Sequence, residues 1–280
     1  MKKTGFKSGL MLVVLSLSFA IPSYAASSNK EMEKINYSEL KEANQAYFEY
    51  VKSGEKGGFG DKKAIKIKEK YEKLFRDNPS LEKEYAKTID VYSEEAINKD
   101  INKTIREIST GAQIEDEEIK FVQLDDGSFY SVEHTLTKLP DQNNNVQTLS
   151  DTPWSSPYGS YQDQYVVVTY HFMYPDTKLG LTSFLNFTST ELSVYDTTDA
   201  GTWSQLPLVV VNASTAITDN SSKNSSDYAR TRGSYIVNIV GTNGVALLSF
   251  RAYLNSDYTL VEPLMYGVKW TYSHSWSGIQ

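Results

Sequence analysis

The sequence predicts an α+β protein, in which a charged N-terminal segment of about three helices precedes an antiparallel β-sandwich-like domain. Two observations along the chain predict this class. Positions 26–118 hold 17 basic and 21 acidic residues among 93, whereas positions 119–280 hold 8 and 14 among 162. Near the same boundary, the apolar residues change from a spacing of three to four residues to strict alternation. The first spacing is typical of amphipathic helices and the second of half-buried strands.

A third observation is a hairpin signal at positions 234–254. Asn243-Gly244 lies between two runs rich in β-branched and aromatic residues, and both turn residues tolerate the positive φ of a primed turn. The second run has an apolar face that includes Ala246 and Leu248. We therefore expect this strand to lie inside a sheet rather than at its edge.

Residues 1–25 are expected to be a signal peptide. Lys2, Lys3 and Lys7 precede a short apolar run, and Ser23 to Ala25 fits a small-x-small cleavage site. The run is too short to span a bilayer, so we expect cleavage near Ala25, a secreted protein and no transmembrane segment after signal removal.

Charge and cysteine content exclude several classes of protein. The net charge is −7, and it becomes −10 once the three lysines of the signal peptide are removed. An acidic chain lacks the basic footprint of a nucleic-acid-binding protein. Because the chain has no cysteine, it has no disulfide, thiolate metal site or cysteine nucleophile, and apolar burial has to stabilise the fold.

Residues 26–118 are expected to form a small helical bundle. Ser38, Asp61 and Ser80 each precede an apolar stripe with helical spacing and are candidate N-caps. The other faces of these helices are rich in lysine and glutamate, which is typical of surface helices with one packed side.

Residues 119–280 are expected to form about ten short antiparallel strands. Asp125 to Gly127 predicts a second hairpin turn by the same logic as Asn243-Gly244. Positions 138–164 are polar and contain prolines, and we expect them to form a surface loop.

Aromatic side chains are the candidate ligand-binding groups. Trp154 and Tyr158 lie in the predicted loop, Trp203 follows a turn-like segment, and Trp276 lies close to the end of the last strand. Exposed rings of this kind stack on sugar rings. The same strand also carries Trp270 and Tyr272, for which the apolar area favours burial.

We predict no catalytic residues, no metal site and no cofactor. His134, His171 and His274 lie in three separate predicted strands without metal-ligand spacing. Glu133 and Glu262 are candidate acids, but nothing in the sequence pairs them across a cleft.

The predicted function is non-catalytic binding outside the cell, with a glycan or cell-wall polymer as the ligand. Two alternatives remain open from the sequence. One is a secreted toxin or bacteriocin-like effector whose helical segment is a pro-region. The other is an extracellular hydrolase that uses Glu133, His134 or Glu262.

Overall fold

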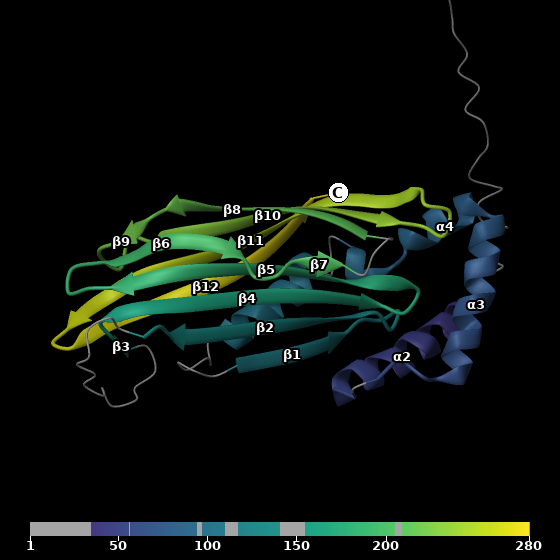
Figure 1. The fold of residues 1–280 in the computed structure, drawn as a ribbon, viewed down its shortest axis with the longest axis horizontal. Helices are drawn as coiled ribbons and strands as arrows, with labels where there is room; N and C mark the ends of the chain where they lie inside the picture. Colours follow the sequence, from purple (N-terminus) through teal and green to yellow (C-terminus); the bar gives the residue numbers. More distant parts are fainter. Residues whose placement is uncertain are drawn as a thin grey trace, which may run out of the picture.

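The fold consists of helices followed by two packed antiparallel sheets, which confirms the predicted α+β class (Figure 1). It is described from a computed structural model over residues 35–55, 57–93, 97–109, 117–140, 155–204 and 209–279. The predicted signal peptide lies outside these residues. The helical elements are α2 (Tyr37–Ser53), α3 (Lys62–Asp77), α4 (Pro79–Ala86), the 3-10 turn η1 (Asp90–Tyr92), the π-helical turn η2 (Ile97–Ile101) and α6 (Asn102–Ser109).

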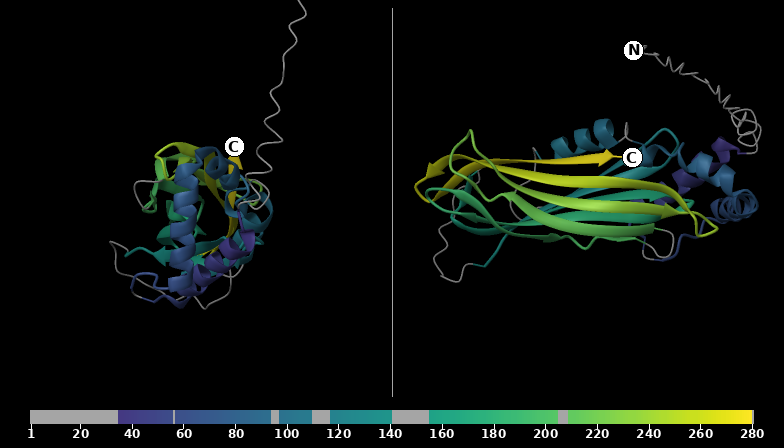
Figure 2. Two further views of the ribbon diagram at one scale, coloured as in Figure 1. Left: turned by 90° about the vertical axis from the view of Figure 1, so that its right-hand side faces the viewer. Right: turned by 90° about the horizontal axis from the view of Figure 1, so that it is seen from above.

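The strands form two sheets, here called sheet A and sheet B. Sheet A has the order β1 (Glu117–Gln123), β2 (Phe129–Lys138), β4 (Gly159–His171), β5 (Tyr174–Phe187), β6 (Leu192–Asp199) and β9 (Ser221–Ser222), with β7 (Trp203–Ser204) paired to β5. Sheet B has the order β3 (Ser155–Pro157), β12 (Gly267–Ile279), β11 (Ala246–Leu264), β10 (Ala229–Val240) and β8 (Val209–Asp219). The long strands of both sheets run along the long axis of the molecule (Figure 1, Figure 2).

The hairpin predicted at positions 234–254 is confirmed as β10 and β11. Val237 pairs with Phe250, and β11 lies between β10 and β12, inside the sheet as expected. A register shift at the end of β10 changes the faces next to the turn. As a result Leu247 is buried and Ala246 is exposed, so the predicted apolar face is wrong at Ala246.

The core lies between the two sheets and is built from alternate residues of the long strands. Along β10, Tyr235 and Val237 are 1% exposed, whereas the intervening Ile236 is 39% exposed. Burial of one aromatic side chain removes about 150–250 Å² from water, at about 25 cal/mol per Å². Each buried ring therefore stabilises the fold by up to several kcal/mol, and this burial takes the place of disulfides in a chain without cysteine.

Helices α2, α3 and α4 lie across one end of the sandwich, and we call them the helical cap (Figure 1). The cap holds three hairpin turns through buried polar groups. Asn44 of α2 accepts a hydrogen bond from Phe172 N in the β4–β5 turn (2.9 Å) and donates one to Asp126 O in the β1–β2 turn (3.2 Å). Glu82 of α4 accepts from Thr242 N in the β10–β11 turn (3.0 Å).

The helical cap and the sheets share one apolar cluster. It joins Leu40, Phe75 and Leu81 of the helices to Val237 and Leu254 of sheet B. The cap therefore completes the core of the sandwich at this end.

Helix α6 covers the side of the sandwich between β1 and β12. Asn102 accepts from Trp276 N (2.8 Å) and donates to Trp276 O (2.6 Å), which satisfies backbone groups of β12 that no strand reaches. Helix α6 also contacts sheet A, where Thr104 Oγ1 lies 3.0 Å from the hydroxyl of Tyr130 on β2. The apolar face of η2 and α6 consists of Ile101, Ile105 and Ile108, each at most 1% exposed.

The helix starts differ in part from the predicted caps. Asp61 caps α3 as expected. Helix α2 begins two residues early, because the side chain of Asn36 accepts from the backbone N–H of Ser38 and so replaces Ser38 as the N-cap. Helix α4 begins at Pro79, ahead of Ser80, since proline is pre-set for the first helical turn.

The surface loop predicted at positions 138–164 is wrong over its described part. Lys138 still belongs to β2, and residues 155–157 and 159–164 form β3 and the first half of β4. These strands are held by pairing with β12, β2 and β5, so their polar composition does not prevent them from forming. Residues 141–154 lie outside the described residues.

Candidate functional site

Trp276 is buried, so the prediction that its ring is exposed is wrong. It is 2% exposed and belongs to the same apolar cluster as Ile101 and Ile105. The physical reason is helix α6, which covers the end of β12 where we expected solvent. Trp270 is buried as its apolar area favours, and Tyr272 is half-buried.

The other predicted aromatic residues have different outcomes. Trp154 lies outside the described residues. Trp203 opens the short strand β7, and its side chain is likewise outside the description. Tyr158 is half-buried between β3 and β4, and its hydroxyl donates to Leu264 O (2.5 Å). Tyr158 therefore supports the β11–β12 turn.

The β11–β12 turn carries Met265, the most exposed large apolar side chain of the described residues, next to an exposed tyrosine. Met265 is 82% exposed and Tyr266 is 51% exposed, between the paired residues Leu264 and Gly267. The turn lies at the end of the sandwich opposite the helical cap (Figure 1, Figure 2). We call Leu264–Gly267 together with the supporting Tyr158 the distal tip.

Inside the sandwich, a second candidate site joins two strands of sheet A. His134 of β2 and Asp163 of β4 point inward, and Asp163 pairs in register with Leu136, two residues from His134. His134 Nε2 lies 2.6 Å from Asp163 Oδ1. Both side chains are at most 2% exposed.

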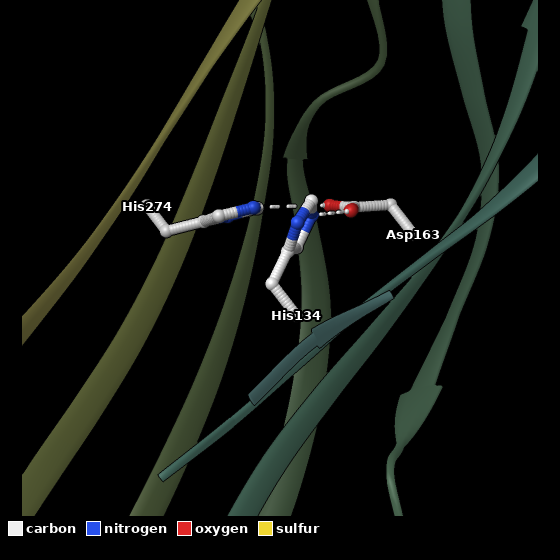
Figure 3. Close-up of side chains that lie close together, drawn as sticks. All are labelled: His134, Asp163 and His274. Carbon is white, nitrogen blue, oxygen red and sulfur yellow. Dashed lines mark hydrogen bonds and ion pairs between the residues drawn. The ribbon is translucent and has the colours of Figure 1, made fainter. Parts of the chain in front are cut away.

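Sheet B contributes the third member of this site, His274 of β12. Its Nε2 lies 3.5 Å from Asp163 Oδ2 (Figure 3). Its Nδ1 lies 2.8 Å from the hydroxyl of Ser256, directly opposite on β11. Tyr258 donates to Asp163 Oδ2 (2.5 Å). We call His134, Asp163 and His274 the His–Asp cluster, which bridges the two sheets.

Burial and charge act on the ionisation of this cluster in opposite directions. Burial works to raise the pKa of Asp163, but His274, His134 and the hydroxyl of Tyr258 stabilise its carboxylate, and its pKa is lowered. Burial lowers the pKa of His274 to about 4, against the attraction of Asp163. At neutral pH the cluster therefore contains a buried carboxylate beside a neutral His274 ring.

The His–Asp cluster belongs to a polar layer that crosses the whole sandwich. The layer separates two apolar clusters of the core. One cluster lies next to the helical cap and includes Tyr165 and Val237, and the other lies towards the distal tip and includes Tyr161 and Trp270. On β4, for example, Asp163 lies between Tyr165 and Tyr161. The other hydroxyls are well paired, with Ser183 Oγ 2.7 Å from Thr231 Oγ1. The layer consists of His134, Asp163, Ser183, Thr231, Ser256 and His274, each at most 3% exposed.

The candidate hydrolase residues do not share a face. Glu133 and His134 are consecutive on β2, and since successive strand residues point to opposite faces, only His134 reaches the interior. Glu262 is exposed on sheet B. Ser256 has a histidine and an aspartate nearby, but it is 1% exposed, so no substrate reaches its hydroxyl in this structure.

His171 lies apart from the other two histidines. It is buried under the helical cap, where its Nδ1 accepts from Met173 N (3.2 Å) and its Nε2 lies 3.3 Å from the hydroxyl of Tyr85. A cavity of about 260 Å³ lies nearby, between α2, α4 and the β1–β2 turn, and is lined in part by Tyr37, Lys41 and Asp125.

The sequence reasoning missed Asp163 because it lay in the predicted loop. The signal was present: Tyr161, Asp163 and Tyr165 alternate with two glutamines, and this alternation extends the inward face of β4 towards its first residues. An aspartate on the same face of a strand as buried aromatic residues indicates a buried carboxylate that has a hydrogen-bond or charge partner.

Comparison with family models, with curated proteins and with solved structures finds no match for this chain. Within the residues that the structure describes, no helix has the length and apolar character needed to cross a membrane.

Proposed function

We propose that this is an exported, non-catalytic binding protein that holds a cell-surface or cell-wall polysaccharide at its distal tip. The observation that carries the proposal is the exposure of Met265 and Tyr266 on the β11–β12 turn, which the hydroxyl of Tyr158 holds by a hydrogen bond to Leu264 O. An exposed apolar pair at the end of a long, well-packed hairpin costs hydration free energy that a bound partner would recover. A tyrosine ring also offers a flat face to sugar C–H groups and a hydroxyl to sugar oxygens.

The surroundings of the distal tip support a polar, uncharged ligand. The β5–β6 turn lies at the same end (Figure 1) and carries the exposed residues Ser189 and Thr190, whose hydroxyls suit hydrogen bonding to a glycan. The acidic net charge of −7 disfavours polyanionic polymers. A neutral polysaccharide is the ligand class that fits both observations.

Two geometric observations weigh against the alternative functions. Hydrolysis by Glu133 and His134 is disfavoured because these side chains lie on opposite faces of sheet A. A removable helical pro-region is disfavoured because the cap and the sheets share one apolar cluster, so cleavage would expose the core.

The test is retention of the chain from residue 26 to 280 on insoluble polysaccharides and isolated cell walls. Tyr266→Ala is expected to lower the affinity for the bound polymer about two- to tenfold, which matches ~0.5–1.5 kcal/mol for one aromatic contact. Its matched control is Tyr195→Ala, because Tyr195 of β6 is 52% exposed but lies outside the distal tip. Trp154→Ala is the companion variant, since binding by Trp154 stays a prediction.

Both tyrosine variants are expected to melt at the wild-type temperature. Equal retention of wild type and Tyr266→Ala on every polymer would refute the role of the distal tip. Release of sugar from the polymer by the wild-type protein would favour the hydrolase, and permeabilisation of intact cells would favour the toxin.

A further inference from the structure

We propose that the His–Asp cluster is a binding site for one divalent transition-metal ion, with Zn²⁺ as the best-fitting ion. His134 Nε2, the Asp163 carboxylate and His274 Nε2 are the three protein ligands. The ion would tie sheet A to sheet B in the middle of the sandwich. This inference is independent of the polysaccharide proposal, because the cluster is buried and the distal tip is exposed.

The donor atoms already lie close to metal-binding distances. One nitrogen or oxygen atom from each of the three residues lies within 4.8 Å of the others. A tetrahedral zinc ion with bonds of about 2.0–2.1 Å holds neighbouring donors about 3.3 Å apart. The His274 Nε2–Asp163 Oδ2 distance of 3.5 Å fits this value, and the His134 Nε2–Asp163 Oδ1 distance of 2.6 Å has to open by about 0.7 Å.

An unpaired nitrogen points into the cluster. His274 Nε2 is buried without a hydrogen-bond partner, although the ring is only 3% exposed. If Nδ1–H of this ring donates to the Ser256 hydroxyl at 2.8 Å, Nε2 carries a lone pair that faces the Asp163 carboxylate. Two electron-rich groups that face each other need a proton or a metal cation between them, and a metal ion fills this role while both groups stay deprotonated.

The charge of Asp163 leads to the same conclusion. The carboxylate is 2% exposed, and among the described residues its ion pairs are with His134 and His274, without a lysine or arginine. An isolated buried carboxylate is costly and has to be neutralised by a proton or a cation. A metal ion supplies that positive charge while both rings stay neutral, the form in which imidazole binds metals.

The surrounding residues hold two of the three ligands, His274 and Asp163, as in known metal sites, whereas Nδ1 of His134 has no hydrogen-bond partner among the described residues. Ligating histidines usually pair their second nitrogen with an oxygen, which Ser256 provides for His274, and ligating carboxylates are hydrogen-bonded in turn, which Tyr258 provides for Asp163. The ring of Tyr165 stacks on His274 with centroids 4.9 Å apart, and that of Tyr272 stacks on His134 at 5.1 Å. These rings restrict reorientation of the imidazoles.

The donor set selects the class of ion. Two imidazoles and one carboxylate suit Zn²⁺ and its first-row neighbours, whereas Mg²⁺ and Ca²⁺ prefer six or more oxygen ligands. Since the cluster is buried, the ion is assigned a structural role, in the layer where the apolar core of the sandwich is interrupted.

The experiment measures metal content and metal-dependent stability of the secreted chain, residues 26–280. After chelator treatment and addition of Zn²⁺, followed by removal of free ion, elemental analysis is expected to find one zinc per chain. Zn²⁺ is also expected to raise the Tm. Cobalt in place of zinc is expected to give the intense visible absorption of a four-coordinate nitrogen and oxygen site, in which one water molecule completes the three protein ligands.

The variants Asp163→Asn and His274→Gln are expected to lose the bound zinc and the Tm shift. The control His171→Gln, which changes a buried histidine outside the cluster, is expected to keep both. If either cluster variant fails to fold, the cobalt spectrum of the wild type still reports the ligands. Two results would overturn the proposal: no retained metal with an unchanged Tm, or equal zinc retention in all the folded variants.

Discussion

The two ends of the sandwich are closed in different ways. At one end, buried side chains of the helical cap hold the turns, as Asn44 does for Phe172 and Glu82 does for Thr242. At the other end, the β11–β12 turn projects Met265 and Tyr266 into solvent. One hairpin architecture is thus used in two ways: the turns at the capped end are part of the core, and the turn at the uncapped end exposes apolar side chains, where we propose that the ligand binds.

The same substitution at the two ends gives the largest expected contrast. Tyr85 of the cap is 3% exposed and Tyr266 of the distal tip is 51% exposed. Tyr85→Ala is expected to lower the free energy of unfolding by about 3–5 kcal/mol, because it leaves a cavity in the shared core. Tyr266→Ala is expected to change it by less than about 0.5 kcal/mol. Urea unfolding measures both values, and equal effects would refute the division of roles.

Lowering the pH is expected to destabilise the capped end through His171, a titratable group buried there. Burial and the nearby Lys68 lower the pKa of His171 from 6.5 to about 3. Below pH 6.5 the unfolded chain therefore binds a proton that the native ring does not. The free energy of unfolding attributable to His171 falls as the pH drops through this window, by about 1.4 kcal/mol per pH unit.

Among the described residues, the groups in direct contact with His171 carry no negative charge that would stabilise its protonated ring. Met173 N–H donates to Nδ1, the hydroxyl of Tyr85 and the amide of Asn44 lie near Nε2, and the ring of Tyr174 packs alongside. His171→Gln is expected to remove this part of the pH dependence. Urea unfolding between pH 6.5 and pH 4 tests it, and identical slopes for wild type and variant would contradict the assignment.

A smaller effect is expected from Asn44, which joins two turns to the cap. Asn44→Ala leaves Phe172 N–H and Asp126 O without their partner, and the two lost hydrogen bonds, at about 0.5–1.5 kcal/mol each, together cost about 1–3 kcal/mol. Asn212→Ala, at an exposed position of β8, is the control and is expected to change stability by less than about 0.5 kcal/mol. Equal denaturant midpoints for the two variants would show that the cap does not hold these turns.

Much of the fold could be predicted from the sequence, because local patterns specify it. The Asn243-Gly244 turn and the alternation of Tyr235 and Val237 define a hairpin without reference to the rest of the chain. The burial of Trp276 could not be predicted in this way, because it depends on Asn102 and on the isoleucines of a helix far away in the sequence.

The interior site illustrates the same limit. His134 and His274 are 140 positions apart in the numbering and come from different sheets. No spacing rule connects them, and Asp163 was obscured by the polar residues around it. Only the register of β2 with β4, and the packing of sheet A on sheet B, bring the three side chains together.

The pairing of Asn102 with Trp276 has a consequence for how the chain folds. These partners are separated by 174 residues, and Glu82 and Thr242 by 160. The helices are synthesised first, whereas the β10–β11 turn and strand β12, which α4 and α6 cover, are synthesised last. Such non-local closure is slow, so the early helices have to wait, with their apolar stripes exposed, until translation reaches the final strand.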